Sequence, residues 1–173
     1  MAEAVAANRG VAGPDSAALA RWIALLLPLA LLGGALFSQY AGGLHPCEMC
    51  YWQRWPHGAA ILLAALAFTA PAESPRSRTL TLLAALAIAV SGAIGVYHAG
   101  VEAHVFPGFT TCTALPKGLS TAEMLKAITH APLVRCDQVQ FRFLGISMAG
   151  WNAILSLSGA AAILLLSLRR PSR

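Results

Sequence analysis

Four long stretches without a charged side chain constrain this chain more than any other feature of its sequence. They cover residues 22–47, 55–72, 79–101 and 143–168. The hydrocarbon core of a bilayer is about 30 Å thick, and an α-helix needs roughly 20 apolar residues to cross it. We therefore predict an all-α integral membrane protein, a bundle of four transmembrane helices over about residues 22–41, 54–71, 79–99 and 148–168.

The composition supports a membrane protein and argues against a soluble or disordered chain. Hydrophobic residues make up 57% of the 173 residues and charged residues only 11%, whereas soluble domains are about 25% charged. Disorder needs low hydrophobicity and high net charge. The net charge of +5 comes from 12 basic against 7 acidic residues. We expect membrane lipid as a partner and no nucleic acid.

Basic residues near the ends of the spans predict the orientation of the chain. Seven arginines fall in segments that share one side of the membrane if there are four spans, namely Arg9, Arg21, Arg76, Arg78, Arg169, Arg170 and Arg173. The loops at about 42–53 and 100–147 hold basic residues at lower density, mixed with acidic ones. The positive-inside rule then places segments 1–21 and 169–173 in the cytoplasm and both loops outside.

All four cysteines lie in the two loops predicted to face outward. Cys47 and Cys50 are in the first loop, and Cys112 and Cys136 are in the second. Thiols outside the cytoplasm tend to be oxidised. Orientation and cysteine placement are independent observations, and both point to an oxidising compartment.

The spacing Cys47-Glu48-Met49-Cys50 is suited to reversible disulfide chemistry. The predicted second span begins just after it, so Cys50 falls in or near the first turn of a helix, where the helix dipole favours an anion. Arg54 follows Cys50 by four residues, one helical turn, on the same face. A cation entering the hydrocarbon edge is costly and marks a candidate functional site. The alternative for Arg54 is a side chain that snorkels to the headgroups.

The residues alone leave three other interpretations of the cysteines open. They could form structural disulfides, stay as inert thiols, or bind zinc through four thiolates. The zinc site is disfavoured because Cys112 and Cys136 are 24 positions apart, so a second close pair is missing. Redox activity is the favoured interpretation, and no metal is expected.

Aromatic and histidine side chains gather near the outward ends of the spans. The aromatic residues are Tyr51, Trp52, Trp55, Tyr97 and Trp151. They fit an interfacial aromatic belt, or alternatively a slot for a flat lipophilic cofactor. His57, His98 and His104 are candidates for hydrogen bonding on the same side, although a lone histidine is more often structural.

Two local patterns concern packing and helix capping. Small residues at Ala87, Ser91, Gly95 and Ala99 form one helical stripe and predict close helix packing. In the second outer loop, the segment from Ser120 to Glu123 fits a capping box. Leu119 and Met124 fit the accompanying hydrophobic staple, and we expect Pro132 to end this short helix.

Three segments together resemble the DsbB family of disulfide bond formation proteins over about residues 20–168. They are CEMCYWQRWP at residues 47–56, YHAGVE at 97–102 before Cys112, and FRFLGISM at 141–148 after Cys136 and before Trp151. Four spans with one C-x-x-C in the first outer loop and two cysteines in the second make a specific combination.

The resemblance implies a four-helix protein of the bacterial inner membrane that reoxidises a periplasmic, DsbA-like thioredoxin-fold protein. By position, Cys112 would form the mixed disulfide with the partner, and Cys136 would be its disulfide mate and then engage Cys47. Cys50 would be released as a thiolate beside a membrane quinone, ubiquinone or menaquinone. Arg54 would hold that thiolate and polarise a quinone oxygen.

The resemblance also implies residues near the quinone besides Cys50 and Arg54. Trp52 is expected there, together with a histidine that corresponds to His98 or His104, of which His98 lies in the better-matched stretch. Two other functions remain as alternatives. One is a DsbB-like protein dedicated to a single client, and the other is a non-catalytic membrane scaffold with structural disulfides.

Overall fold

The structure, a computed structural model, describes residues 16–108, 120–130 and 134–168. This part of the chain is mostly helical and contains one short hairpin. Its elements are α1 (Ser16–Tyr40), α2 (Glu48–Ala67), α3 (Pro75–Glu102), α4 (Thr121–His130), β1 (Arg142–Phe143), β2 (Ile146–Ser147) and α5 (Met148–Leu168).

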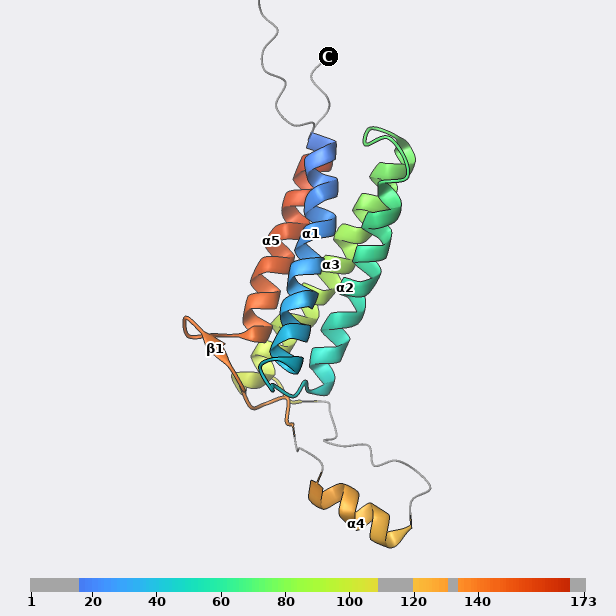
Figure 1. The fold of residues 1–173 in the computed structure, drawn as a ribbon. Helices are drawn as coiled ribbons and strands as arrows, with labels where there is room; N and C mark the ends of the chain where they lie inside the picture. Colours follow the sequence, from blue (N-terminus) through green and yellow to red (C-terminus); the bar gives the residue numbers. More distant parts are fainter. Residues whose placement is uncertain (1–15, 109–119, 131–133, 169–173) are drawn as a thin grey trace, which may run out of the picture.

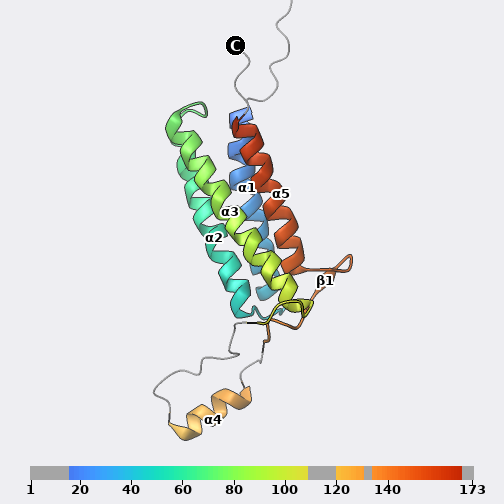
Figure 2. The ribbon, with the colours of Figure 1, turned by 180° about the vertical axis from the view of Figure 1, so that it is seen from behind.

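The long helices α1, α2, α3 and α5 lie side by side (Figures 1 and 2), and α3 makes its main contacts with α2 and α5. The start of α1, the end of α5 and the α2–α3 turn lie at one end of the bundle (Figure 1). The α1–α2 connection, the end of α3 and the start of α5 lie at the other end. The cysteines that the structure describes are therefore all at this second end.

Three helices of the described chain are long and apolar enough to cross a membrane, namely α1, α3 and α5. α2 does not meet this criterion, and its first ten residues include Glu48, Gln53, Arg54 and His57. Crossing of the membrane by α2 therefore stays a prediction. α2 also ends at Ala67, four residues before the predicted end of its span, whereas α5 covers the same residues as the predicted fourth span.

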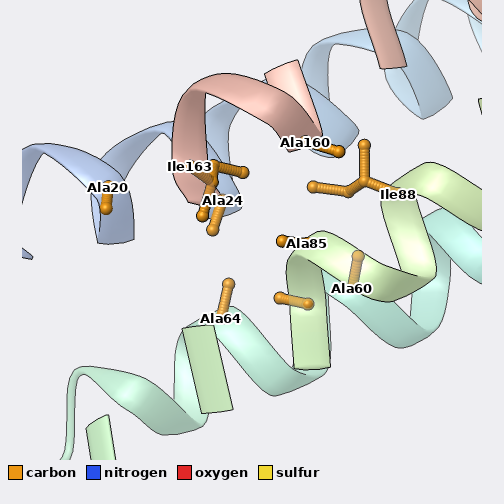
Figure 3. Close-up of a cluster of buried hydrophobic side chains, with 9 residues drawn as sticks. Ala20, Ala24, Ala60, Ala64, Ala85, Ile88, Ala160 and Ile163 are labelled. Atoms are coloured by element: carbon orange, nitrogen blue, oxygen red, sulfur yellow. The ribbon is translucent and has the colours of Figure 1, made fainter. Parts of the chain in front are cut away.

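Small side chains fill the centre of the bundle. Figure 3 shows alanines of α1, α2, α3 and α5 directed toward one another around Ile88 and Ile163. Small residues let helix backbones approach closely in a membrane. In the predicted stripe, Ser91 and Gly95 are buried, and a Cβ atom on Gly95 would lie 3.1 Å from backbone atoms of Ala149 and Ala153 in α5. The sequence therefore identified one of the tightest helix contacts.

The predicted capping box at the start of α4 is confirmed. The Ser120 N–H donates to Glu123 Oε2 at 3.0 Å, and the Glu123 N–H donates to Ser120 Oγ at 3.5 Å. The hydrogen bonds from Ser120 lower the pKa of Glu123. Leu119 and Pro132 lie outside the described residues, as does the side chain of Met124. α4 lies apart from the four long helices (Figure 1).

A short antiparallel hairpin leads directly into α5. Arg142 pairs with Ser147, and Phe143 pairs with Ile146. The two turn residues, Leu144 and Gly145, both have positive φ, at 50° and 80°, as a tight two-residue hairpin turn requires. The Trp151 indole N–H donates to the carbonyl of Phe143 at 2.9 Å and ties the hairpin to the first turn of α5. We did not predict this hairpin from the sequence.

Candidate functional site

The two cysteines of the C-x-x-C motif form the start of α2. Cys47 is the N-cap residue in an extended conformation, and its Sγ accepts a hydrogen bond from the Cys50 N–H at 3.4 Å. Cys50 therefore lies in the first turn of the helix, as predicted. The two Sγ atoms are 3.0 Å apart, and both residues are thiols in this structure. The helix start thus presents a dithiol whose sulfurs are already in contact.

The two thiols differ in acidity. Both lie before the predicted span of α2. The hydrogen bond from Cys47 lowers the pKa of Cys50, and the positive charge of Arg54 lowers it further, while burial and the charge of Glu102 oppose the shift. The same hydrogen bond, together with burial, raises the pKa of Cys47. Because the thiolate is the reactive form, Cys50 is the thiol prepared to react and Cys47 the one that holds its proton.

A third cysteine reaches this site from the second outer loop. The Sγ atoms of Cys47 and Cys136 and a ring nitrogen of His98 all lie within 4.8 Å of one another, and all three residues are buried. This arrangement is compatible with thiol–disulfide exchange between the loops. Zinc also takes ligands of these types. Cys112 lies outside the described residues.

Gln53 determines the orientation of the imidazole beside Cys47. Its Nε2 donates to His98 Nδ1 at 2.8 Å and to the Met49 carbonyl at 3.1 Å. Since His98 Nδ1 accepts this bond, the proton of the neutral ring is on Nε2. Nε2 faces Cys47 Sγ at 3.5 Å and Glu102 Oε1 at 3.9 Å. His98 can therefore donate a hydrogen bond to the sulfur of Cys47, and its ring also forms a hydrogen bond with the backbone of Cys136.

The other end of the Gln53 amide leads into a buried polar network between α2, α3 and α5. Asn152 Nδ2 donates to Gln53 Oε1 at 2.8 Å. Asn152 Oδ1 accepts from Ser156 Oγ at 3.0 Å and contacts His57 Nε2 at 2.9 Å. Ser91 Oγ donates to the Gln53 carbonyl at 2.9 Å and lies 3.0 Å from His57 Nε2. Polar groups inside a membrane bundle commonly mark functional sites.

Arg54 is held by neutral acceptors on α1. Its Nη1 donates to Gln39 Oε1 at 2.5 Å, and its Nη2 donates to the carbonyl of Ala35 at 3.2 Å. Its guanidinium also lies over the ring of Tyr51, 5.2 Å from the ring centre. Within the described ranges no carboxylate pairs with it, and its buried Nε has no hydrogen-bond partner. The positive charge therefore stays available to an anion or to a polar ligand.

A cavity of about 610 Å³ joins these groups to an apolar wall, a volume typical of small-molecule sites. The apolar wall comes mainly from α1, and the polar lining includes Cys47, Cys50, Gln53, Arg54, His57, His98, Glu102 and Asn152. Two of its lining residues, Arg54 and His57, each carry a buried nitrogen without a partner among the described residues. Apolar walls with unpartnered polar atoms fit a flat lipophilic molecule that bears oxygen atoms.

The structure brings most of the predicted site residues to this cavity. Cys50, Arg54 and His98 line it, and so does Trp151. Trp52 does not, and its side chain is exposed. Of the two candidate histidines, His98 is buried beside Cys47, whereas His104 is exposed and outside the lining. The geometry therefore favours His98.

Similarity to known proteins shows which protein family the chain belongs to. The family model described as "Disulfide bond formation protein DsbB" matches residues 17–166. The chain belongs to the DsbB family. "Disulfide bond formation protein B" of Shewanella sp. (strain MR-4) is 31% identical, over 85% of each chain. The relative of the same name from Aromatoleum aromaticum is 29% identical, over 81% of this chain and 86% of the relative. No solved structure matches.

Membership of the DsbB family makes the chain a membrane protein of disulfide bond formation with a disulfide oxidoreductase role. "Disulfide bond formation protein B 1" of Pseudomonas putida, 31% identical over 77% of this chain and 73% of the relative, agrees with this conclusion. The three long apolar helices fit it as well.

Several polar residues of the site in this DsbB-family chain were not predicted from the sequence. Hydrogen bonds of Gln53 and Asn152 connect His98 with His57. The charge of Glu102 raises the pKa of Cys50. Gln53 directly precedes Arg54, and Asn152 is a polar residue inside a predicted span. Since buried amides in a membrane helix are costly and often functional, both could have been singled out. Nothing in the sequence indicated which groups they would join.

Proposed function

We propose that this chain is a thiol:quinone oxidoreductase of the bacterial inner membrane that reoxidises a periplasmic, DsbA-like thioredoxin-fold protein. The observation that carries the proposal is the placement of Cys50 and Arg54 on one cavity between apolar helices. Cys50 is the more acidic thiol of the pair, and Arg54 has no carboxylate partner among the described residues. A dithiol beside a lipophilic cavity is suited to passing electrons to a lipid-soluble acceptor.

We further propose that all four long helices cross the membrane, with both termini in the cytoplasm. The start of α1, the end of α5 and the α2–α3 turn lie at one end of the bundle (Figure 1). That end carries Arg21, Arg76 and Arg78, which the positive-inside rule favours on the cytoplasmic side. Cys47, Cys50 and Cys136 are then periplasmic, where a soluble partner reaches them.

The exchange steps run through four cysteines. A thiolate of the reduced partner attacks Cys112 in the Cys112–Cys136 disulfide, forms the mixed disulfide and releases the Cys136 thiolate. That thiolate attacks Cys47 in the Cys47–Cys50 disulfide and releases the Cys50 thiolate. The second thiolate of the partner then closes its own disulfide and releases Cys112, which attacks Cys136 and releases Cys47. Each step exchanges one disulfide for another, and the two electrons of the partner end on Cys47 and Cys50.

The residues of the cavity fit a quinone, either ubiquinone or menaquinone. When bound, a quinone supplies an acceptor for two electrons and two protons. Arg54 stabilises the Cys50 thiolate by its charge and offers its unpartnered Nε or its Nη donors to a ring oxygen. His98 Nε2 lies 3.5 Å from Cys47 Sγ, where it can donate a hydrogen bond to this sulfur. The wall from α1 places apolar side chains beside these polar groups.

The direct test is steady-state turnover of the purified full chain in detergent. A reduced DsbA-like protein and a soluble ubiquinone analogue are added, and loss of quinone absorbance is followed in the parent and in Cys50→Ser. We expect turnover in the parent and none above background in the variant. No turnover with either ubiquinone or menaquinone analogues, in protein with both disulfides closed, would refute the proposal.

The partner is tested separately by trapping mixed disulfides with Cys136→Ala. In this variant Cys112 is a lone thiolate, which can attack the disulfide of an oxidised partner, form the mixed disulfide and release the partner's second thiolate. No Cys136 thiolate is then present to carry the exchange on to Cys47, so the mixed disulfide should be trapped. We expect a DsbA-like thioredoxin-fold protein among the trapped adducts. Adducts with only one other client would support a dedicated redox protein. Disulfides that all resist mild reductant would indicate a scaffold, since structural disulfides have low potentials.

A further inference from the structure

His57 lines the cavity and has a hydrogen-bonding atom without a partner among the described residues. The side chain is only 3% exposed, and the residue lines the cavity two helical turns after Cys50. Its Nδ1 is buried and has no partner in the described part of the chain. Burying a polar atom without a partner costs free energy. Nothing in the exchange steps above explains why this nitrogen is left open.

The surrounding network determines which form of His57 is present. Asn152 Nδ2 donates to Gln53, so Asn152 Oδ1 is the atom that faces His57 Nε2 at 2.9 Å. A carbonyl oxygen only accepts, so Nε2 carries the proton of the neutral ring and Nδ1 holds a lone pair. The contacts of Nε2 are the neutral groups of Asn152 and Ser91, which give an imidazolium no compensating charge.

The position of His57 relative to Arg54 suits two opposite oxygens of one ring. The two residues are three positions apart on α2, a rise of about 4.5 Å along a helix. Both side chains line the same cavity. The two oxygens of a para-quinone lie across a six-membered ring, a separation of similar size. A ring lying along α2 with one oxygen at Arg54 brings its other oxygen toward His57.

We propose that His57 forms the subsite for the quinone oxygen farther from Cys50, and that its Nδ1 accepts a hydrogen bond from the hydroxyl formed there on reduction. This inference rests on the proposed quinone function. Nδ1 without a proton has nothing to donate to a quinone carbonyl, but it can accept from the hydroxyl of a hydroquinone. The subsite therefore favours the reduced form over the oxidised form.

Tighter binding of the hydroquinone than of the quinone makes the bound quinone a stronger oxidant. The dithiol of Cys47 and Cys50 loses two electrons and two protons when it closes to a disulfide, and a quinone takes up both pairs as it becomes a hydroquinone. Tenfold tighter binding of the hydroquinone than of the quinone raises the potential of this two-electron couple by about 30 mV. His57 would thus be a positioning and specificity residue for the electron acceptor.

The test measures binding of both redox forms by the oxidised full chain in detergent, under anaerobic conditions. The probes are a decyl-chain ubiquinone analogue and its hydroquinone. His57→Gln keeps a side-chain amide near the position of Nε2, where it can bind Asn152, but it has no atom at the position of Nδ1. His57→Asn is the matched control, because its amide reaches the Nδ1 position and not that of Nε2.

In His57→Gln, we expect the ratio of quinone Kd to hydroquinone Kd to fall about tenfold, while the quinone Kd itself changes less than about twofold. In His57→Asn, we expect this ratio to stay within about threefold of the parent value. A merely structural role would weaken both forms together and leave the ratio unchanged. An unchanged ratio in His57→Gln overturns the inference alone. A parent that binds neither form overturns the proposed function as well.

Discussion

The Cys50 thiol accepts a hydrogen bond from Cys47 and lies near Arg54, and these contacts lower its pKa while the same bond raises the pKa of Cys47. A thiol with a lowered pKa becomes a thiolate at lower pH. In the fully reduced protein we therefore expect iodoacetamide to modify Cys50 with a midpoint on the acidic side of an ordinary cysteine, and Cys47 only at higher pH. Mass spectrometry of both sites against pH measures this. Earlier modification of Cys47 would contradict the assignment.

The two glutamates near the motif provide a matched pair. Glu102 carries the charge that raises the pKa of Cys50, whereas Glu48, although it lies within the motif, is exposed. We expect Glu102→Gln to move the Cys50 alkylation midpoint to lower pH and Glu48→Gln to leave it unchanged. The same pH series tests both variants. An equal shift of the Cys50 midpoint in Glu48→Gln and Glu102→Gln would contradict the assignment of this charge effect to Glu102.

Arg54 combines a positive charge with a planar set of hydrogen-bond donors, and substitutions can remove the donors without removing the charge. Arg54→Lys keeps the charge but cannot bridge Gln39 and Ala35 as the guanidinium does. We expect the KM for a quinone analogue to rise about tenfold in Arg54→Lys, as for loss of one hydrogen bond to a charged group, with Cys50 acidity retained. Arg54→Gln should lose both properties. A parent-like KM in both variants would contradict the proposed contact with quinone.

The packing of helix α3 against helix α5 depends on a glycine. A Cβ atom at Gly95 would meet backbone atoms of α5 at 3.1 Å, whereas one at Gly33 would meet nothing within 4 Å. We expect Gly95→Ala to destabilise the protein by about 1–3 kcal/mol. Gly33→Ala should be neutral or stabilising by up to about 1 kcal/mol. Thermal unfolding in detergent, followed by circular dichroism, compares the two. Equal stability would show that α3 and α5 separate without cost.

Periodicity, charge and motif spacing predicted much of this architecture. The long apolar stretches predicted helices at α1, α3 and α5, and the Cys50–Arg54 spacing predicted a thiol and a cation at the start of α2. The sequence could not show that the side chain of Trp52 turns away from the cavity, because this depends on how α2 is rotated against α1. It could not show the amide pair of Gln53 and Asn152 either, since they are 99 residues apart.

At the scale of the whole molecule, the dithiol, the cavity and Cys136 gather at one end of the bundle, and the proposed orientation places that end in the periplasm. On a background with all four cysteines replaced by serine, we expect Val105→Cys to react with a membrane-impermeant maleimide in spheroplasts. Glu73→Cys, in the α2–α3 turn, should react only after lysis. Both positions are exposed. Labelling of both in intact spheroplasts would contradict the orientation.

The central claim is that the electrons of the Cys47–Cys50 dithiol pass to a quinone. The most direct measurement is a single turnover without any partner protein. A chain with Cys112 and Cys136 replaced by serine, and with Cys47 and Cys50 reduced, is mixed anaerobically with one equivalent of a ubiquinone analogue. Quinone loss and the thiol states of Cys47 and Cys50 are measured together. We predict that each quinone reduced is matched by one Cys47–Cys50 disulfide, and that Cys50→Ser reduces none. Quinone loss without closure of this disulfide, or closure without quinone loss, would contradict the account.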